Sequence, residues 1–190
     1  MTPICFYYGF LISYSLTDFT RAFVSCTLGV EQVGLILIVY GALNTIAGFG
    51  VGKLVQHTGL PILYMVGGLF DVTNFVLQLL FRPTASSRYW VYAFSAMLGT
   101  SDGVWQTTIA ITMANLFEDR RETAFAAISL WSVFAMMIGF VMSGRVCLKI
   151  RLISLIVLVI LGCLGYGVTE RKRRRREKNH LPEEERIIAN

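Results

Sequence analysis

The chain has 190 residues, of which 55% are hydrophobic and only 15% are charged, and its formal net charge is +5. Soluble domains carry about 25% charged residues, and one soluble core cannot hide this much apolar surface, so a soluble globular domain is excluded. Disorder is excluded for most of the chain, because disordered segments are poor in aliphatic and aromatic residues. A membrane protein remains.

A helix needs about 20 mainly apolar residues to cross the bilayer. Six stretches of the sequence, each with at most one internal charge, are candidates for such helices. In chain order they are residues 2–17, 32–53, 61–81, 89–115, 123–144 and 152–169. A cleavable signal peptide is an alternative for the first, but the positively charged start of such a peptide is missing. The runs are too long for β-barrel strands and do not alternate. The sequence therefore predicts an all-α membrane protein with a six-helix domain over 1–170 and a basic and polar tail over 171–190.

Lysine and arginine residues predict the orientation, because they favour the cytoplasmic side. With both termini inside, the inside loops hold three, the tail eight and the outside loops six. The tail decides, since the loops alone favour the opposite orientation. We expect an integral membrane protein of the plasma membrane with both termini in the cytoplasm. Because the basic run adjoins an apolar span, we expect it to contact membrane lipid and not nucleic acid.

Small residues recur every seven positions in the second predicted helix, at Gly34, Gly41 and Gly48. Such residues let a neighbouring backbone approach closely. The pattern predicts a packing face, and a surface that rocks against a partner helix is the functional alternative.

Polar side chains inside two predicted spans form the candidate functional site. The third span holds Asp71, Asn74 and Gln78 on one helix face, and the fourth holds Asp102, Trp105 and Gln106. A carboxyl group at this depth is costly unless it is neutral, paired or facing water, so such residues are functional candidates. The alternative is a clamp between helices, with Asp71 or Asp102 bonded to Asn44 or Thr107. Because no lysine or arginine lies in the interior of a predicted span, no buried ion pair is expected.

The sequence contains no arrangement typical of an enzyme. We find no HExxH pair, no glycine-rich phosphate loop and no G-x-S-x-G elbow. The four cysteines and two histidines have no metal-ligand spacing. The sequence therefore predicts a non-enzymatic protein without catalytic residues, metal or cofactor.

The segment from Gly52 and Lys53 to Gly59 resembles a worn copy of the signature loop of the major facilitator superfamily. More specific stretches resemble the unc-ninety-three-like family of that superfamily. They are residues 18–26, 101–107, 116–118, 124–126 and 130–131, in the order and at the spacing of the family.

This resemblance implies the C-terminal six-helix half of a twelve-helix protein, built from inverted three-helix repeats. We therefore expect either a fragment or truncated product, or a half that pairs with a second six-helix unit, either its own missing half or a dimer mate. The resemblance implies a non-enzymatic accessory protein, similar to regulatory subunits of two-pore potassium channels. The alternatives are a solute transporter with Asp102 and Gln106 in its path and Asp71 as a proton site, and a half-protein without independent activity. Ser129 and Ser132 replace a basic and an acidic residue of the family, which weakens the case for ion-coupled transport.

Overall fold

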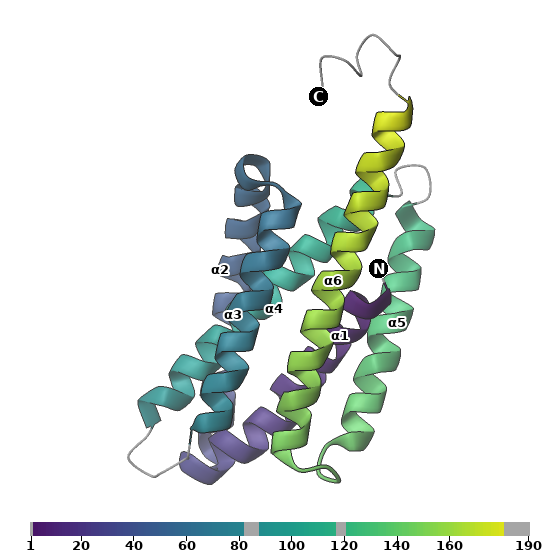
Figure 1. The fold of residues 1–190 in the computed structure, drawn as a ribbon. Helices are drawn as coiled ribbons and strands as arrows, with labels where there is room; N and C mark the ends of the chain where they lie inside the picture. The colour runs from purple at the N-terminus through teal and green to yellow at the C-terminus, as the bar shows by residue number, and fades with distance from the viewer. Residues whose placement is uncertain (1, 82–87, 117–120, 181–190) are drawn as a thin grey trace.

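The structure, a computed structural model, describes residues 2–81, 88–116 and 121–180, and every regular element within them is a helix. The predicted all-helical class is thereby confirmed. The elements, shown in Figure 1, are α1 (Thr2–Ser13), η1 (Tyr14–Ser25), η2 (Val30–Gln32), α2 (Val33–Thr58), α3 (Leu60–Leu80), α4 (Arg88–Leu116), α5 (Arg121–Met142) and α6 (Leu148–His180). Both α3 and α4 begin and end within one residue of the predicted segments.

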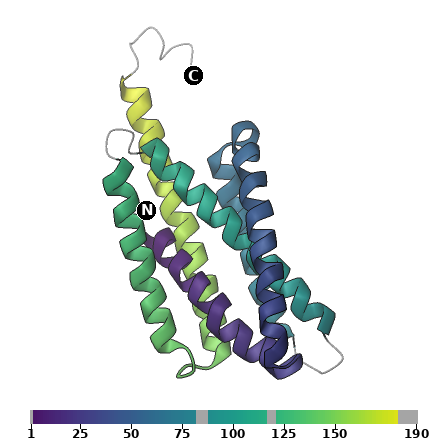
Figure 2. The ribbon, with the colours of Figure 1, turned by 180° about the vertical axis from the view of Figure 1, so that it is seen from behind.

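Four helical segments in the described residues are long and apolar enough to cross a membrane. They are Val30–Thr58, Leu60–Leu80, Phe125–Met142 and Leu148–Arg171. They mark the chain as an integral membrane protein. Helix α1, which has only 12 residues, and the more polar α4 run obliquely across the bundle, as the view from behind shows (Figure 2).

The packing of the helices follows a repeated pattern. Helix α2 packs on α4, α5 packs on α1, and α3 lies beside α6. Helix α4 also contacts α3, and α1 contacts α6. If α1, α2 and α3 are exchanged with α4, α5 and α6, each of these pairs becomes another pair of the set or itself. The two halves of the chain therefore make equivalent contacts.

The first helix is longer than the predicted span over residues 2–17. The helix continues beyond residue 17 as η1, a π-helical stretch that ends at Ser25 and includes Asp18 and Arg21. Hydroxyl groups support its wider turns, since Thr17 Oγ1 donates to the carbonyl of Ser13 at 2.6 Å and Ser25 Oγ to that of Thr20 at 3.1 Å. Asp18 does not end the helix, because Arg151 of α6 forms an ion pair with it inside the bundle.

The predicted signature loop is wrong as a loop. Helix α2 continues to Thr58, so Gly52 and Lys53 are helical, and Gly59 alone separates α2 from α3. Its φ of 78° lies in the left-handed region, which glycine adopts without a steric cost. At the other end of the chain, α6 includes residues 171–180 of the predicted tail, whereas residues 181–190 lie outside the described residues. The Gly59 turn and the end of α6 lie at the same end of the bundle (Figure 1).

Candidate functional site

Asp71 on α3 is at the centre of the polar cluster, with no exposed surface. One carboxylate oxygen, Oδ2, accepts hydrogen bonds from the Tyr7 hydroxyl of α1 at 2.5 Å and from the indole N–H of Trp105 on α4. The other, Oδ1, accepts from the hydroxyl of Ser101, also on α4. Each donor lies on a helix other than α3, so this carboxylate ties three helices together. Both of its oxygens are occupied.

Asp102 on α4 forms the second group, and only 6% of its surface is exposed. Its Oδ2 accepts from the Tyr40 hydroxyl at 2.8 Å and from the Asn44 amide, both on α2. The bond from Asn44 is one of those that the clamp alternative anticipated. The phenol of Tyr8, next to Tyr7 on α1, approaches the same carboxylate. In contrast to Asp71, Asp102 has one buried oxygen, Oδ1, without a hydrogen-bond partner among the described residues.

Two glycines of α4 bring α2 close enough for these bonds. A Cβ atom at Gly99 would collide with the carbonyl of Tyr40, and one at Gly103 would collide with that of Asn44. The carbonyls that touch the glycines thus belong to the residues that bond Asp102. This G-x-x-x-G spacing around the carboxyl group is the signal that the sequence analysis missed.

The glycines that the sequence analysis did select are placed differently. A Cβ atom at Gly34 or Gly41 would meet no atom of this chain's described residues within 4 Å. At Gly48 it would lie 3.3 Å from the hydroxyl of Thr107 on α4. Among the described residues, only the last glycine of the predicted packing face contacts a neighbouring helix.

Asn74 and Gln78 form a third polar group, one to two turns along α3 from Asp71. The Gln78 amide donates to Asn74 Oδ1 at 2.8 Å, and the Tyr14 hydroxyl of η1 donates to Gln78 Oε1 at 2.5 Å. All three side chains are buried. Gln106, which the sequence grouped with Asp102, lies outside these groups because its side chain is exposed.

A small groove between α1 and α5 adjoins the Asp102 group. It has a volume of about 220 Å³, and its lining includes Tyr8, Ser129 and Ser132. Tyr8 therefore lies both in this groove and beside the Asp102 carboxylate. The two serines place hydroxyl groups there.

A buried ion pair was missed by the sequence analysis, which expected none. Arg151 on α6 has no exposed surface, and its Nε donates to Asp18 Oδ2 at 2.9 Å. Ser143 donates to the other Asp18 oxygen at 2.9 Å, and Arg151 Nη2 donates to Ser13 Oγ at 2.9 Å. The guanidinium also lies 5.0 Å from the centre of the Phe10 ring.

The expectation of no buried ion pair was wrong because it placed Asp18 and Arg151 in loops. Each residue lies inside a helix, since η1 continues past Asp18 and α6 begins at Leu148. Opposite charges at the same predicted membrane boundary were the available signal. Arg151 was also counted among the six lysines and arginines of the outside loops. Because it lies in a helix and is paired with Asp18, it no longer counts toward the predicted orientation.

Most polar atoms of the cluster are bonded within the bundle, and two of its buried atoms, Asp102 Oδ1 and the Asn74 amide nitrogen, have no hydrogen-bond partner among the described residues. The carboxylates and amides mainly bond residues of other helices, and Asp102 Oδ1 is the free carboxylate oxygen among the buried atoms described. Within the described residues, no three His, Cys, Asp or Glu side chains gather as metal ligands would. The geometry can hold helices in register, and at Asp102 it can accept one further donor or a proton.

Comparison with known proteins identifies relatives. A family model described as "Ion channel regulatory protein UNC-93" matches residues 1–166. The chain is 33% identical over 164 residues to "Protein unc-93 homolog A" of Homo sapiens, which covers 86% of this chain and 36% of that protein. It is 25% identical to the "Putative potassium channel regulatory protein unc-93" of Caenorhabditis elegans, over 90% of this chain and 24% of that protein.

A plant protein, "UNC93-like protein 3" of Arabidopsis thaliana, is 29% identical over 83% of this chain and 35% of its own length. The chain thus spans about a third or less of these relatives. No solved structure matches. The family that the sequence motifs resembled is confirmed.

Proposed function

The chain belongs to the UNC-93 family of ion channel regulatory proteins, and we propose from this premise that it is a non-enzymatic membrane accessory protein that regulates a potassium channel. The relative from Caenorhabditis elegans is named for that role. The observation that carries the proposal is the bonding of Asp71, whose two oxygens accept from Tyr7, Trp105 and Ser101. A carboxylate bonded on every side stabilises a bundle that acts through its surface, whereas a transport path needs polar groups that are free to bind a substrate.

The apolar surfaces of α2 and α5 are suited to contact a partner in the membrane. Ile38 and Phe49 on α2 are 67% and 75% exposed, and Leu130 on α5 is 70% exposed. These helices lie on opposite flanks of the bundle (Figure 1). Helices of a channel, or of a second six-helix half, can cover them.

We further propose that six helical segments, α1 together with η1 and then α2 to α6, cross the membrane as one half of a major facilitator-type fold. The equivalent contacts of the first and last three helices support two inverted repeats. Helix α4, with 29 residues, is long enough to span despite its polar side chains. The coverage of about a third of each relative supports a second half, on the parent chain or on a dimer mate. In this arrangement both termini lie in the cytoplasm at the plasma membrane.

Two native cysteines test this arrangement. Cys26 and Cys147 are exposed, and they follow η1 and α5 at the end of the bundle away from the Gly59 turn. A membrane-impermeant maleimide added to intact cells should label both residues, whereas an antibody to a C-terminal tag should bind only after permeabilisation. Replacement of Cys26 and Cys147 by serine is the control. Labelling that requires permeabilisation would contradict the orientation.

The function is tested with one conservative variant, Asp102→Asn, in two assays. Co-expression with a two-pore potassium channel should change the whole-cell potassium current, and the variant should change it equally, because the introduced amide retains hydrogen-bonding capacity toward α2. A current that is the same with and without the chain would contradict the regulator and support a half-protein without independent activity.

A transporter is the second candidate, and the unpartnered Asp102 Oδ1 is the observation that favours it. If Asp102 carries a proton during transport, with Gln106 and Asp71 along the path, Asp102→Asn should abolish proton-coupled uptake. Uptake that depends on Asp102, together with an unchanged channel current, would replace the regulator by the transporter.

A further inference from the structure

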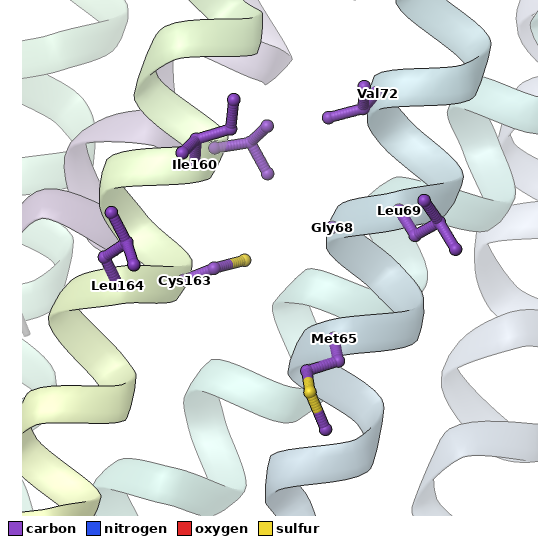
Figure 3. Close-up of a pocket in the computed structure, with 8 residues that line it drawn as sticks. Met65, Gly68, Leu69, Val72, Ile160, Cys163 and Leu164 are labelled. Atoms are coloured by element: carbon purple, nitrogen blue, oxygen red, sulfur yellow. The ribbon is translucent and has the colours of Figure 1, made fainter.

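An apolar groove runs between α3 and α6 on a face that the polar cluster does not use (Figure 3). Its lining lies between Met65 and Val72 on α3 and between Val159 and Leu164 on α6. The groove has a volume of about 300 Å³ and no charged residue in its lining. Both helices are among the segments apolar enough to cross the membrane, so we expect the groove to open toward lipid.

Small residues form the floor of the groove and large ones form its rim. A Cβ atom at Gly68 would lie 2.7 Å from the sulfur of Cys163, so the two helices approach closely at this point. Met65, Leu69 and Leu164 are 65%, 71% and 62% exposed and stand to either side. The result is a slot with flexible aliphatic walls.

A basic run follows the groove along α6. The helix continues past Cys163 to His180, and seven lysines and arginines lie between Arg171 and Lys178. Arg171 is eight residues beyond Cys163, about 12 Å at 1.5 Å per residue. On the antiparallel α3, the helix begins at Leu60, eight residues before Gly68. The positive charge therefore begins level with the first residue of α3, where the membrane surface is expected.

We propose that this groove binds one acyl chain of an anionic phospholipid whose headgroup contacts the basic run of α6. At about 30 Å³ for each water-sized unit, and with a methylene group of similar size, the groove accommodates a stretch of about ten carbons. A chain lying in it carries its phosphate toward the end of α6, where Arg171 is exposed. The apolar slot and the cationic end match the two parts of such a lipid.

A partner transmembrane helix fits the groove less well. Helices in membranes associate through small residues that let backbones approach and through polar groups that bond across the interface. Here the space beside the small residue, Gly68, is already occupied by the side chain of Cys163. The exposed rim of the groove consists of large aliphatic side chains. Flexible acyl chains tolerate such a rim, whereas a second helix would be held away by it.

The test uses the whole chain in phosphatidylcholine vesicles that contain a trace of phospholipid with a photoactivatable diazirine in its acyl chain. Two probes differ only in the headgroup, phosphatidylserine or phosphatidylcholine. The labelled peptides are mapped by mass spectrometry. We expect the serine probe to label residues 65–72 and 159–164 at least about threefold more than the choline probe, since each basic residue near an anionic surface contributes about fivefold to binding.

Variants separate the two parts of the site. Val72→Phe fills the groove and should lower labelling there severalfold, whereas Val66→Phe, on the same helix but with a 59% exposed side chain outside the groove, should not. Replacing Arg173, Arg174 and Arg175 by glutamine should lower the preference for the serine probe severalfold and leave the acyl contact.

Three results would overturn the proposal. They are equal labelling by both probes in the wild-type chain, labelling spread evenly over the exposed faces of α2 and α5, and protection of the groove by a crosslinked partner helix. The wild-type map decides even if a variant does not fold.

Discussion

The buried ion pair between Asp18 and Arg151 gives the sharpest prediction for stability. Arg151 has no exposed surface, Asp18 is 7% exposed, and their closest atoms are 2.9 Å apart. Removing one partner of a buried pair leaves an uncompensated charge and costs about 3–5 kcal/mol. Arg151→Met should therefore destabilise the chain by that amount, which at about 2–4 °C per kcal/mol for a chain of this size is a fall in Tm of about 6–20 °C.

The assay is thermal unfolding in detergent, followed by size exclusion of the tagged chain. Asp18→Leu should cost as much as Arg151→Met, and the double variant should recover most of the loss, because apolar residues can replace a buried pair without a large cost. Arg145→Met is the matched control, since Arg145 is exposed and should tolerate the change. Equal stability of the wild-type chain and both single variants would refute the buried pair. Additive losses in the double variant would show that the two residues do not interact.

Further changes test the polar cluster by the same unfolding assay. Gly103→Ala should cost about 1–3 kcal/mol through overpacking against α2, whereas Gly41→Ala, in open space, should change little; equal effects would contradict the close approach. Asp71→Leu should cost at least about 3 kcal/mol, because it leaves three buried donors without an acceptor at about 1–3 kcal/mol each; a neutral result would exclude the clamp. Gln78→Ala should cost about 1–3 kcal/mol, and the exposed Gln106→Ala less than about 0.5 kcal/mol; the reverse order would contradict the assigned burial.

The long apolar elements were predictable from local composition. Helices α3 and α4 lie within one residue of the predicted segments because a glycine, Gly59, precedes the apolar run of α3 and charged residues follow both runs. The same criterion placed the end of the second helix too early, at Lys53. An exposed lysine in the last turns of a helix does not end it, and α2 continues to Thr58. The criterion also placed Asp18 and Arg151 outside the helices, for another reason. A search along the chain evaluates each charge alone, whereas the cost of burying a charge depends on its partner in space.

The candidate site was predictable as a set of residues but not as a set of contacts. Asp71 and Asp102 stand out as carboxyl groups within apolar runs. Their donors come from other helices, and the sequence does not say which helices meet. The glycines show the same limit, because the period of Gly34 and Gly41 does not reveal whether a helix lies opposite. Gly103 could have been selected, since it closes a G-x-x-x-G pattern around Asp102.

Potassium flux in a purified system tests the central claim most directly. A two-pore potassium channel is reconstituted into vesicles with and without the chain, and vesicles with the chain alone are the control. We predict that the chain changes the flux through the channel, that Asp102→Asn changes it equally, and that the chain alone carries no flux. A flux through the channel that is the same with and without the chain would contradict the proposed regulatory role.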